Sequence, residues 1–245
     1  MLTKAQIKHL QGLKLKKYRQ NYEDFVIEGE KLVTEALLEN VYPDLLIATA
    51  DWLQANRRSI PEAVQVVETS MADIEKISSL STPQPVLALM KKKEVSINTI
   101  DITQKWSLAL DGISDPGNFG TILRTADWFG IDTVLCSNDC VDLYNPKVIQ
   151  STMGSIFRMS VCYFDLHDYL ASCNLPKYAA VLDGEMLDNH IWPEKGVLVI
   201  GSESHGISSK VLATCNHAIT IPSYGKSESL NAAIATGILL HDIKR

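Results

Sequence analysis

Short apolar runs alternate with segments of helical periodicity along the chain, most clearly in its second half. Apolar runs there predict strands at 107–110, 132–136, 159–164, 178–182, 196–200 and 218–221. Between them, apolar residues spaced three to four apart predict helices at 118–129, 145–153, 166–172, 208–214 and 229–243. Strands that alternate with helices in this way are typical of an α/β fold with a mostly parallel sheet covered on both faces.

The first part of the chain follows the same alternation on a smaller scale. Helices are predicted at 3–19, 30–39 and 71–77, and strands at 24–28, 44–48, 64–68 and 85–90. A run of lysines at 91–93 ends the apolar pattern, and few large apolar groups follow until about residue 105. We therefore expect a small α/β domain over residues 1–93, a linker over 94–105 and a second α/β domain over 106–245.

The last predicted helix, 229–243, is apolar on nearly every side. Such a helix is buried on more than one face. We infer that it packs against its own sheet and also against a partner subunit in a homodimer. Burial wholly within one chain is the alternative. The apolar residues of this helix, which are distributed around its circumference, are Ala232, Ala233, Ile234, Ala235, Ile238, Leu239 and Leu240.

Composition narrows the class of protein. The chain has 245 residues, of which 46% are hydrophobic and 21% charged, as in an ordinary globular protein. No apolar run reaches the roughly 18 residues of a membrane span, and the N-terminal residues lack the apolar core of a signal peptide. Five cysteines without paired spacing argue against a disulfide framework or a zinc site. We expect a cytoplasmic protein with reduced thiols, no metal and no membrane partner.

Charge is distributed unevenly. The net charge is −6, yet residues 1–19 carry no Asp or Glu. Such a local basic patch can bind nucleic-acid phosphates even on an acidic chain, and the alternative is a solvated helix face. The patch consists of Lys4, Lys8, Lys14, Lys16, Lys17 and Arg19. We take Lys14, Lys16, Lys17 and Arg19 as its candidate RNA-binding residues.

Three motifs stand out in the second domain. The first, DGISDPGNFGTILRTADWFG at 111–130, reads as strand, turn and helix, an architecture that offers backbone N–H groups to a ligand. The second is LVIGSESHG at 198–206, and the third is IPSYGKSESLN at 221–231. Each has a structural alternative by itself. Asn118 could be a helix N-cap, Glu203 could pair with a surface lysine, and Ser229 and Asn231 could cap the last helix.

Together, in this order, the motifs resemble those of the SpoU (TrmH-like) branch of the SPOUT RNA methyltransferases. The family pattern is N-x-G-x-x-x-R, then an apolar strand ending G-x-E-x-x-G, then I-P-x-x-G-x-x-x-S-L-N, and every fixed position is filled. The resemblance covers residues 105–245. It implies a SPOUT α/β-knot domain with a C-terminal trefoil knot, and an active site completed across a homodimer.

The first domain resembles the L30e-like substrate-binding domain that is often fused to these enzymes. The segments that carry this resemblance are KKYR at 16–19, FVIEGE at 25–30 and STPQPV at 81–86. The fused domain favours ribosomal RNA as the substrate, and transfer RNA is the alternative. A non-catalytic RNA-binding or ribosome-assembly factor on the same fold is a further alternative, although its signature would be the loss of Asn118 or Arg124, and both are present.

The resemblance implies methyl transfer from S-adenosylmethionine to a ribose 2′-hydroxyl of RNA. Carried over by position, the cofactor residues are Ile200, Gly201, Glu203, Gly206, Ile221, Ser229 and Leu230. The catalytic residues are Asn118, Arg124, Glu203, Ser229 and Asn231. In the family the arginine is proposed to take the hydroxyl proton. Because arginine is effectively always protonated, Arg124 could instead hold the adjacent phosphate and stabilise developing alkoxide charge. Glu203 is then expected to hold Arg124 or its loop.

Two further features bear on these predictions. Family members commonly carry glycine where this chain has Ser204, which leaves the shape of that loop open because serine tolerates positive φ less well. His205, the next residue, is an alternative general base. A conventional dinucleotide-binding fold is the rival for the first motif, since glycines and Asp139 lie near suitable positions. Its G-x-G-x-x-G spacing is absent, however, and it leaves the other two motifs unexplained.

Overall fold

The structure is a computed structural model that describes residues 2–93, 95–96, 100 and 102–245. Residues 94, 97–99 and 101 of the predicted linker lie outside the described residues. The chain forms two compact units. Unit 1 is Met1–Glu94 with Asp142–Phe157, and unit 2 is Val95–Val141 with Arg158–Arg245. Within the described ranges, no helix is long and apolar enough to cross a membrane.

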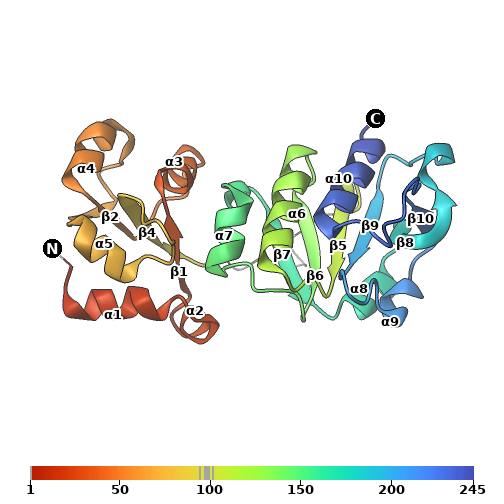
Figure 1. The fold of residues 1–245 in the computed structure, drawn as a ribbon, viewed down its shortest axis with the longest axis horizontal. Helices are drawn as coiled ribbons and strands as arrows, with labels where there is room; N and C mark the ends of the chain where they lie inside the picture. The colour runs from red at the N-terminus through yellow and green to blue at the C-terminus, as the bar shows by residue number, and fades with distance from the viewer. Residues whose placement is uncertain (1, 94, 97–99, 101) are drawn as a thin grey trace. The chain divides into compact units, whose positions relative to one another are not determined.

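Unit 1 is built on a four-stranded mixed sheet of order β1-β4-β2-β3 (Figure 1). The strands are β1 (Asp24–Glu28), β2 (Leu45–Ala48), β3 (Gln65–Glu68) and β4 (Val86–Lys91). β4 runs antiparallel to both β1 and β2, whereas β2 and β3 are parallel. The helices are α1 (Lys4–Gly12), α2 (Lys16–Tyr22), α3 (Glu30–Leu38), α4 (Ala50–Asn56), α5 (Met71–Ile77) and α7 (Pro146–Thr152), with 3₁₀ turns η1 (Arg57–Ser59) and η3 (Ser155–Phe157).

The predicted single helix 3–19 is wrong, because the chain forms two helices there. Thr3 caps α1 in a reciprocal capping box with Gln6. The helix ends at Gly12, and Leu15 adopts an extended conformation before α2 begins. Leu13, which lies in the break between the two helices, is buried. A second omission is α4, where no helix was predicted.

The segment 142–157 packs with unit 1, so the compact units differ at these residues from the predicted domains 1–93 and 106–245. Buried Arg19 donates to Asp142 Oδ2 from Nε at 3.1 Å and from Nη2 at 2.7 Å. The Phe25 and Tyr144 rings meet at 4.6 Å, and Gln150 Nε2 donates to the Glu28 carbonyl at 2.8 Å. These contacts join residues more than a hundred positions apart, which no local pattern reveals.

Arg19→Ala should destabilise unit 1 by roughly 3 kcal/mol, because breaking a buried ion pair leaves its partner unpaired. Besides Asp142, the Arg19 guanidinium satisfies the carbonyls of Leu13 at 2.8 Å and Lys14 at 2.9 Å. Urea unfolding of the full chain checks this expectation, with exposed Arg58→Ala as the matched control. Equal midpoints for the two variants would contradict it.

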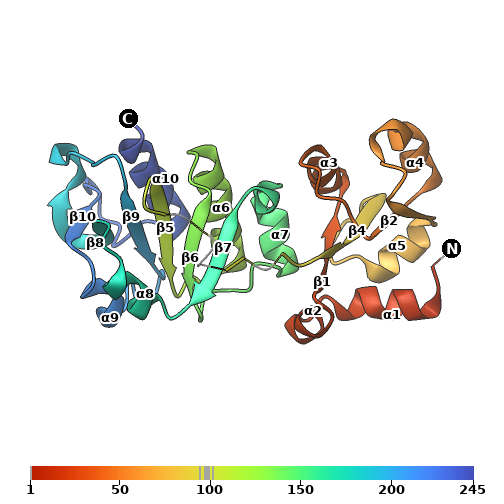
Figure 2. The same cartoon turned by 180° about the vertical axis from the view of Figure 1, so that it is seen from behind.

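Unit 2 is a six-stranded sheet of order β10-β8-β9-β5-β6-β7, in which every pairing is parallel (Figure 2). Its strands are β5 (Trp106–Asp111), β6 (Thr133–Ser137), β7 (Ser160–Phe164), β8 (Lys177–Met186), β9 (Gly196–Gly201) and β10 (His217–Thr220). Its helices are α6 (Pro116–Trp128), α8 (Leu166–Ser172), α9 (Ser209–Leu212) and α10 (Ala232–Ile243), with the 3₁₀ turn η4 (Leu187–Asn189). All six predicted strands are confirmed, as is the parallel α/β class.

Helices cover both faces of this sheet. Alternate strand residues such as Ala109 and Val199 pack with Leu170 of α8 and Val211 of α9 in one core. The views from opposite sides in Figures 1 and 2 show α6 and α10 on the other face. The strands of this sheet are therefore buried on both faces, and the loops that follow and precede them lie at the two ends of the strands.

Candidate active site

The three motifs follow strands that end at the same edge of the unit 2 sheet. β5 ends at Asp111 and β9 at Gly201, and these two residues are partners in register. From β5 the chain proceeds to β6 and β7 on one side, whereas β9 lies on the other side. The crevice outside the carboxyl ends of strands at such a reversal of order is where ligands bind in open α/β sheets.

Motif one begins with a capped helix. The Asp115 side chain accepts from the Asn118 backbone N–H at 2.8 Å, and Pro116 occupies the first turn. Asp115 is therefore the N-cap. The alternative that Asn118 serves as the cap is wrong, and its side chain is left for other contacts. Buried residues of α6 recur at helical spacing and fix the helix on the sheet; they are Phe119, Ile122, Leu123 and Ala126.

Asn118 joins the three motifs through its side chain. Its Nδ2 donates to Glu203 Oε1 of motif two, and its Oδ1 accepts from Asn231 Nδ2 of motif three at 2.9 Å. A carboxylate only accepts, so the amide of Asn118 can satisfy both neighbours in this orientation alone. Asn231 also caps α10, because its Oδ1 accepts from Ala233 N at 3.0 Å. Asn231 therefore caps the last helix, which was the structural alternative for this residue, and also contacts Asn118 in the site.

The Arg124 side chain takes no part in the hydrogen bonds that join Asn118 to Glu203 and Asn231. Arg124 follows Asn118 by six residues, which turns its side chain about two-thirds of the way around the helix. The side chain is exposed, and within the described part of the chain it forms no hydrogen bond or ion pair. Of the two roles expected for Glu203, holding Arg124 or holding the loop, the structure agrees with the second, because Glu203 contacts Asn118 and not Arg124. One turn beyond Arg124, Trp128 is 84% exposed.

The motif-two loop is a tight turn closed by its own backbone. Ser202 and Gly206 exchange N–H···O bonds of 3.1 and 2.9 Å. Gly206 has φ +65°, whereas Ser204 is not among the described residues with positive φ, so serine fits its position. A Cβ on Gly201 would lie 2.1 Å from the Gly206 carbon, and only glycine fits there. His205 is exposed and contacts the Ser204 hydroxyl at 2.8 Å.

Asp111 supports this loop and was not predicted. It is buried at the end of β5, and its Oδ2 accepts from the backbone N–H of Ser208 at 2.7 Å. The next residue, Gly112, has φ +69° and donates to the Ser137 hydroxyl at 2.9 Å. The signal in the sequence was a carboxylate directly after the apolar run at 108–110, at the carboxyl end of the strand.

The predicted cofactor residues lie in the loops that follow β9 and β10. Ile200 is buried and forms the floor, Gly201 and Ile221 are half-buried, and Glu203, Gly206, Ser229 and Leu230 are exposed. Nothing lies within 4 Å of a Cβ built on Gly206 or Gly225, so both loops are open. Open, glycine-bearing backbone beside apolar Ile200 and Leu230 fits a ligand with polar edges and an apolar ring, as S-adenosylmethionine has.

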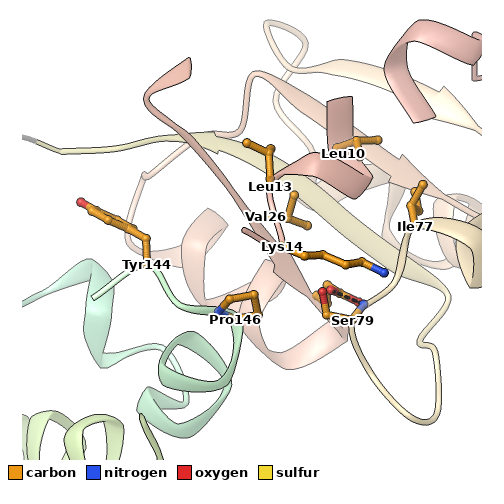
Figure 3. Close-up of a pocket in the computed structure, with 9 residues that line it drawn as sticks. Leu10, Leu13, Lys14, Val26, Ile77, Ser79, Tyr144 and Pro146 are labelled. Carbon is orange, nitrogen blue, oxygen red and sulfur yellow. Dashed lines mark hydrogen bonds between the residues drawn. The ribbon is translucent and has the colours of Figure 1, made fainter. Parts of the chain in front are cut away.

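Two of the four predicted RNA-binding residues are engaged within unit 1. Arg19 is buried in its ion pair and is a wrong prediction. Lys14 Nζ donates to the Ser78 carbonyl at 2.6 Å beside a small cavity (Figure 3). That cavity is lined mainly by apolar side chains and carries no arrangement for catalysis. Lys16 and Lys17 are exposed, as an RNA contact requires.

One acidic group could in principle hold a metal ion. Asp165, His167 and Asp168, at the start of α8, bring their ligand atoms within 4.8 Å of one another. The Asp165 side chain caps the helix by accepting from Asp168 N at 3.1 Å, which accounts for its position. Helix capping therefore accounts for the position of Asp165 at this place.

Comparison with known families matches two consecutive stretches of the chain. The SpoU rRNA Methylase family model matches residues 105–241. The model of the MRM3-like substrate binding domain matches residues 4–88. Among curated proteins, 23S rRNA (guanosine(2553)-2'-O)-methyltransferase RlmP of Bacillus subtilis is 29% identical over 97% of this chain and 95% of its own.

Solved structures are similar over the whole chain. A protein from Porphyromonas gingivalis assigned to the TrmH family of RNA methyltransferases is 40% identical, with a TM-score of 0.87 over 99% of this chain and 98% of that one. An rRNA methyltransferase from Sinorhizobium meliloti with bound AdoMet is 27% identical, with a TM-score of 0.87 over 100% and 95%.

Proposed function

Because the chain belongs to the SpoU rRNA Methylase family, we propose that it methylates the ribose 2′-hydroxyl of a nucleotide in ribosomal RNA. Dependence on S-adenosylmethionine and an RNA substrate follow from the family. Ribosomal RNA is supported by the substrate of the Bacillus subtilis relative and by the match of residues 4–88 to a substrate-binding domain. The observation that carries the proposal is the Asn118 side chain, which bonds Glu203 and Asn231 and so joins all three motifs.

The loops after β9 and β10 are the proposed cofactor site. Leu230 would offer apolar surface to the adenine ring next to buried Ile200, and backbone groups at Gly201, Gly206 and Ile221 would hold the polar edges. When bound, S-adenosylmethionine supplies an electrophilic methyl group. Asn118 and Glu203 then keep the motif-two loop in place, because their hydrogen bond ties it to α6.

The chemistry left to the protein is to orient the hydroxyl and stabilise its oxygen. A ribose hydroxyl is a weak nucleophile until its proton is lost or strongly polarised. Arg124 is proposed to hold the neighbouring phosphate and the developing alkoxide charge, since a guanidinium remains protonated and donates in a planar fork. The exposed Ser229 hydroxyl would orient the ribose. Asn231 would set the position of the motif-three loop through its hydrogen bonds to Asn118 and to the first backbone N–H groups of α10.

We propose that the site is completed in a homodimer. Arg124 has no partner of its own within the described part of the chain and lies on the same exposed face of α6 as Trp128. α10 packs beside this helix, with Gly237 placed so that a Cβ would lie 3.6 Å from Thr125. Ile234 of α10 is 56% exposed. Large apolar side chains left exposed on two neighbouring helices, next to the proposed catalytic arginine, support an interface at this face. A trefoil knot through motifs two and three belongs to the same proposal.

Labelled methyl transfer tests the reaction. The enzyme is incubated with methyl-labelled S-adenosylmethionine and ribosomal RNA lacking modifications, and the RNA is digested to nucleosides. Label should appear in a 2′-O-methyl nucleoside and disappear when the acceptor carries 2′-deoxyribose. Label on a base would overturn ribose methylation, and label in transfer RNA alone would overturn the proposed substrate.

A further inference from the structure

Two tyrosines of α2 form an exposed aromatic row together with His9 of α1. The Tyr18 and Tyr22 rings are nearly parallel, at 9°, with centroids 6.3 Å apart. The Tyr22 ring meets the His9 ring edge-on at 4.7 Å. Tyr18 is 39% and Tyr22 50% exposed. Because large rings are usually drawn into a core, their exposure on one helix face leaves aromatic surface open to a ligand.

The row is held in position by the residues around it. A Cβ on Gly12 would lie 3.5 Å from Tyr18 Cγ, so the Tyr18 ring lies against α1 at its one glycine. His9 Nε2 is 2.9 Å from Asp24 Oδ2, and Lys91 Nζ is 2.5 Å from the other oxygen of that carboxylate. The rings therefore need little reordering to bind a flat partner.

Cations flank the row. Lys16 and Lys17 immediately precede Tyr18 and are exposed. Lys92 N donates to the Glu23 carbonyl at 2.8 Å, which places the lysine run 91–93 beside the end of α2. The acids near Lys91 are Asp24, Glu23 and Asp44, and their charges raise the pKa of Lys91, with the Asp24 hydrogen bond the largest cause. Lysines remain in excess over carboxylates around the two rings.

We propose that Tyr18 and Tyr22 stack on an unpaired base of the RNA substrate while Lys16 and Lys17 hold the adjoining phosphates. This inference rests on the proposed function only in taking RNA as the ligand. An exposed aromatic surface with flanking lysines is the arrangement that binds single-stranded nucleic acid. Bases inside a duplex are stacked on each other and offer no free face, and RNA is read in sequence mainly at loops and bulges. The substrate is thus an RNA loop or bulge.

The test measures binding of the full chain to two RNA probes, without a need for the natural substrate. One probe is a hairpin whose loop of unpaired nucleotides carries 2-aminopurine, and the other is a blunt duplex of equal length. Tyr18→Leu with Tyr22→Leu should weaken hairpin binding about tenfold or more, since each base–ring stack is worth roughly 1–3 kcal/mol. Binding to the duplex should stay within about twofold. Tyr42→Leu, at an exposed tyrosine elsewhere in unit 1, is the matched control.

Two further variants separate stacking from charge and from hydrogen bonding. Tyr18→Phe with Tyr22→Phe should bind the hairpin like the wild type, because the ring is retained. Lys16→Gln with Lys17→Gln should make the slope of log affinity against log salt shallower by about 1.4, at about 0.7 for each lost single-strand phosphate contact. The leucine pair should leave that slope unchanged. Lys31→Gln serves as the control for charge.

Equal losses on hairpin and duplex, or unchanged hairpin affinity in the leucine pair, overturn the stacking role. An unchanged salt slope in the glutamine pair overturns the phosphate role. Binding of S-adenosylmethionine by every variant shows that unit 2 remains folded. Failure of methyl transfer in the wild type, together with tyrosine-dependent hairpin binding, would reject the proposed function and leave this inference standing. Normal methyl transfer by the wild type, together with hairpin binding that does not depend on the two tyrosines, would support the proposed function and reject this inference.

Discussion

Arg124→Ala should lower the rate of methyl transfer by roughly 10²–10³-fold, the usual cost of removing one donor that stabilises developing oxyanion charge. The affinity for S-adenosylmethionine should stay within about twofold, because Arg124 lies on the exposed face of α6 and the proposed cofactor loops follow β9 and β10. Single-turnover kinetics with saturating RNA, combined with calorimetric binding of the cofactor, separate these two effects.

Arg124→Lys sharpens the test. Lysine keeps the charge but lacks the planar fork that can grip a phosphate and an alkoxide at once, so the variant should recover only a small part of the lost rate. Arg58→Ala, at an exposed arginine of unit 1, should behave like the wild type. Single-turnover rates within about threefold of wild type for Arg124→Ala would remove this residue from the catalytic set.

Ile234→Glu with Ile238→Glu should split the proposed homodimer and abolish activity. Both side chains of α10 are exposed in the single chain, at 56% and 37%, so glutamate fits the subunit but not an apolar interface. Sedimentation should then give a species of 27.1 kDa, the mass of one chain. Methyl transfer should be lost when the proposed dimer dissociates, because Arg124 would then lack the partner subunit that completes its site.

The choice of positions matters for this test. Ala233 is buried, so a glutamate there would disturb the subunit itself and could not report on an interface. Leu38→Glu, at a residue 71% exposed on α3, controls for an added surface carboxylate. Circular dichroism of the α10 variant should match that of the wild type. A fully active monomer would reject the dimeric site, as would an unchanged dimer in the α10 variant.

Much of unit 2 could be predicted from the sequence because its signals are local. A buried parallel strand such as β5 or β9 is a short apolar run, and the helix α6 shows its period from Phe119 to Ala126. The three motifs were assigned correctly as one group, and the family match agrees with this. Family resemblance contributed here, since residue patterns alone left a structural alternative for each motif.

The failures share a physical cause, which is that they depend on contacts distant in sequence. Arg19 looked like a surface cation because its neighbours are basic, whereas its real partner is Asp142, 123 residues away. For Glu203 two roles were left open, holding Arg124 or holding the loop, and only the structure shows that Asn118 from the same helix as Arg124 binds that carboxylate. The aromatic pair at Tyr18 and Tyr22 had a local signal, a four-residue spacing next to two lysines. That signal was missed because the predicted helix ended at residue 19, before Tyr22, whereas α2 continues to Tyr22.

The discontinuity of unit 1 bears on how the protein is made. Asp142–Phe157 supplies the partner of Arg19 and the ring that contacts Phe25, so residues 1–93 do not contain all of their own unit. During translation, domains usually fold as soon as they leave the ribosome, the N-terminal one first. Here the four strands of the N-terminal sheet are all synthesised by residue 91, but Arg19 stays unpaired until the ribosome has synthesised β5, α6 and β6 and released the segment that follows. A gene fragment ending at residue 93 would therefore encode the sheet without the ion-pair partner of Arg19 and without the ring that contacts Phe25.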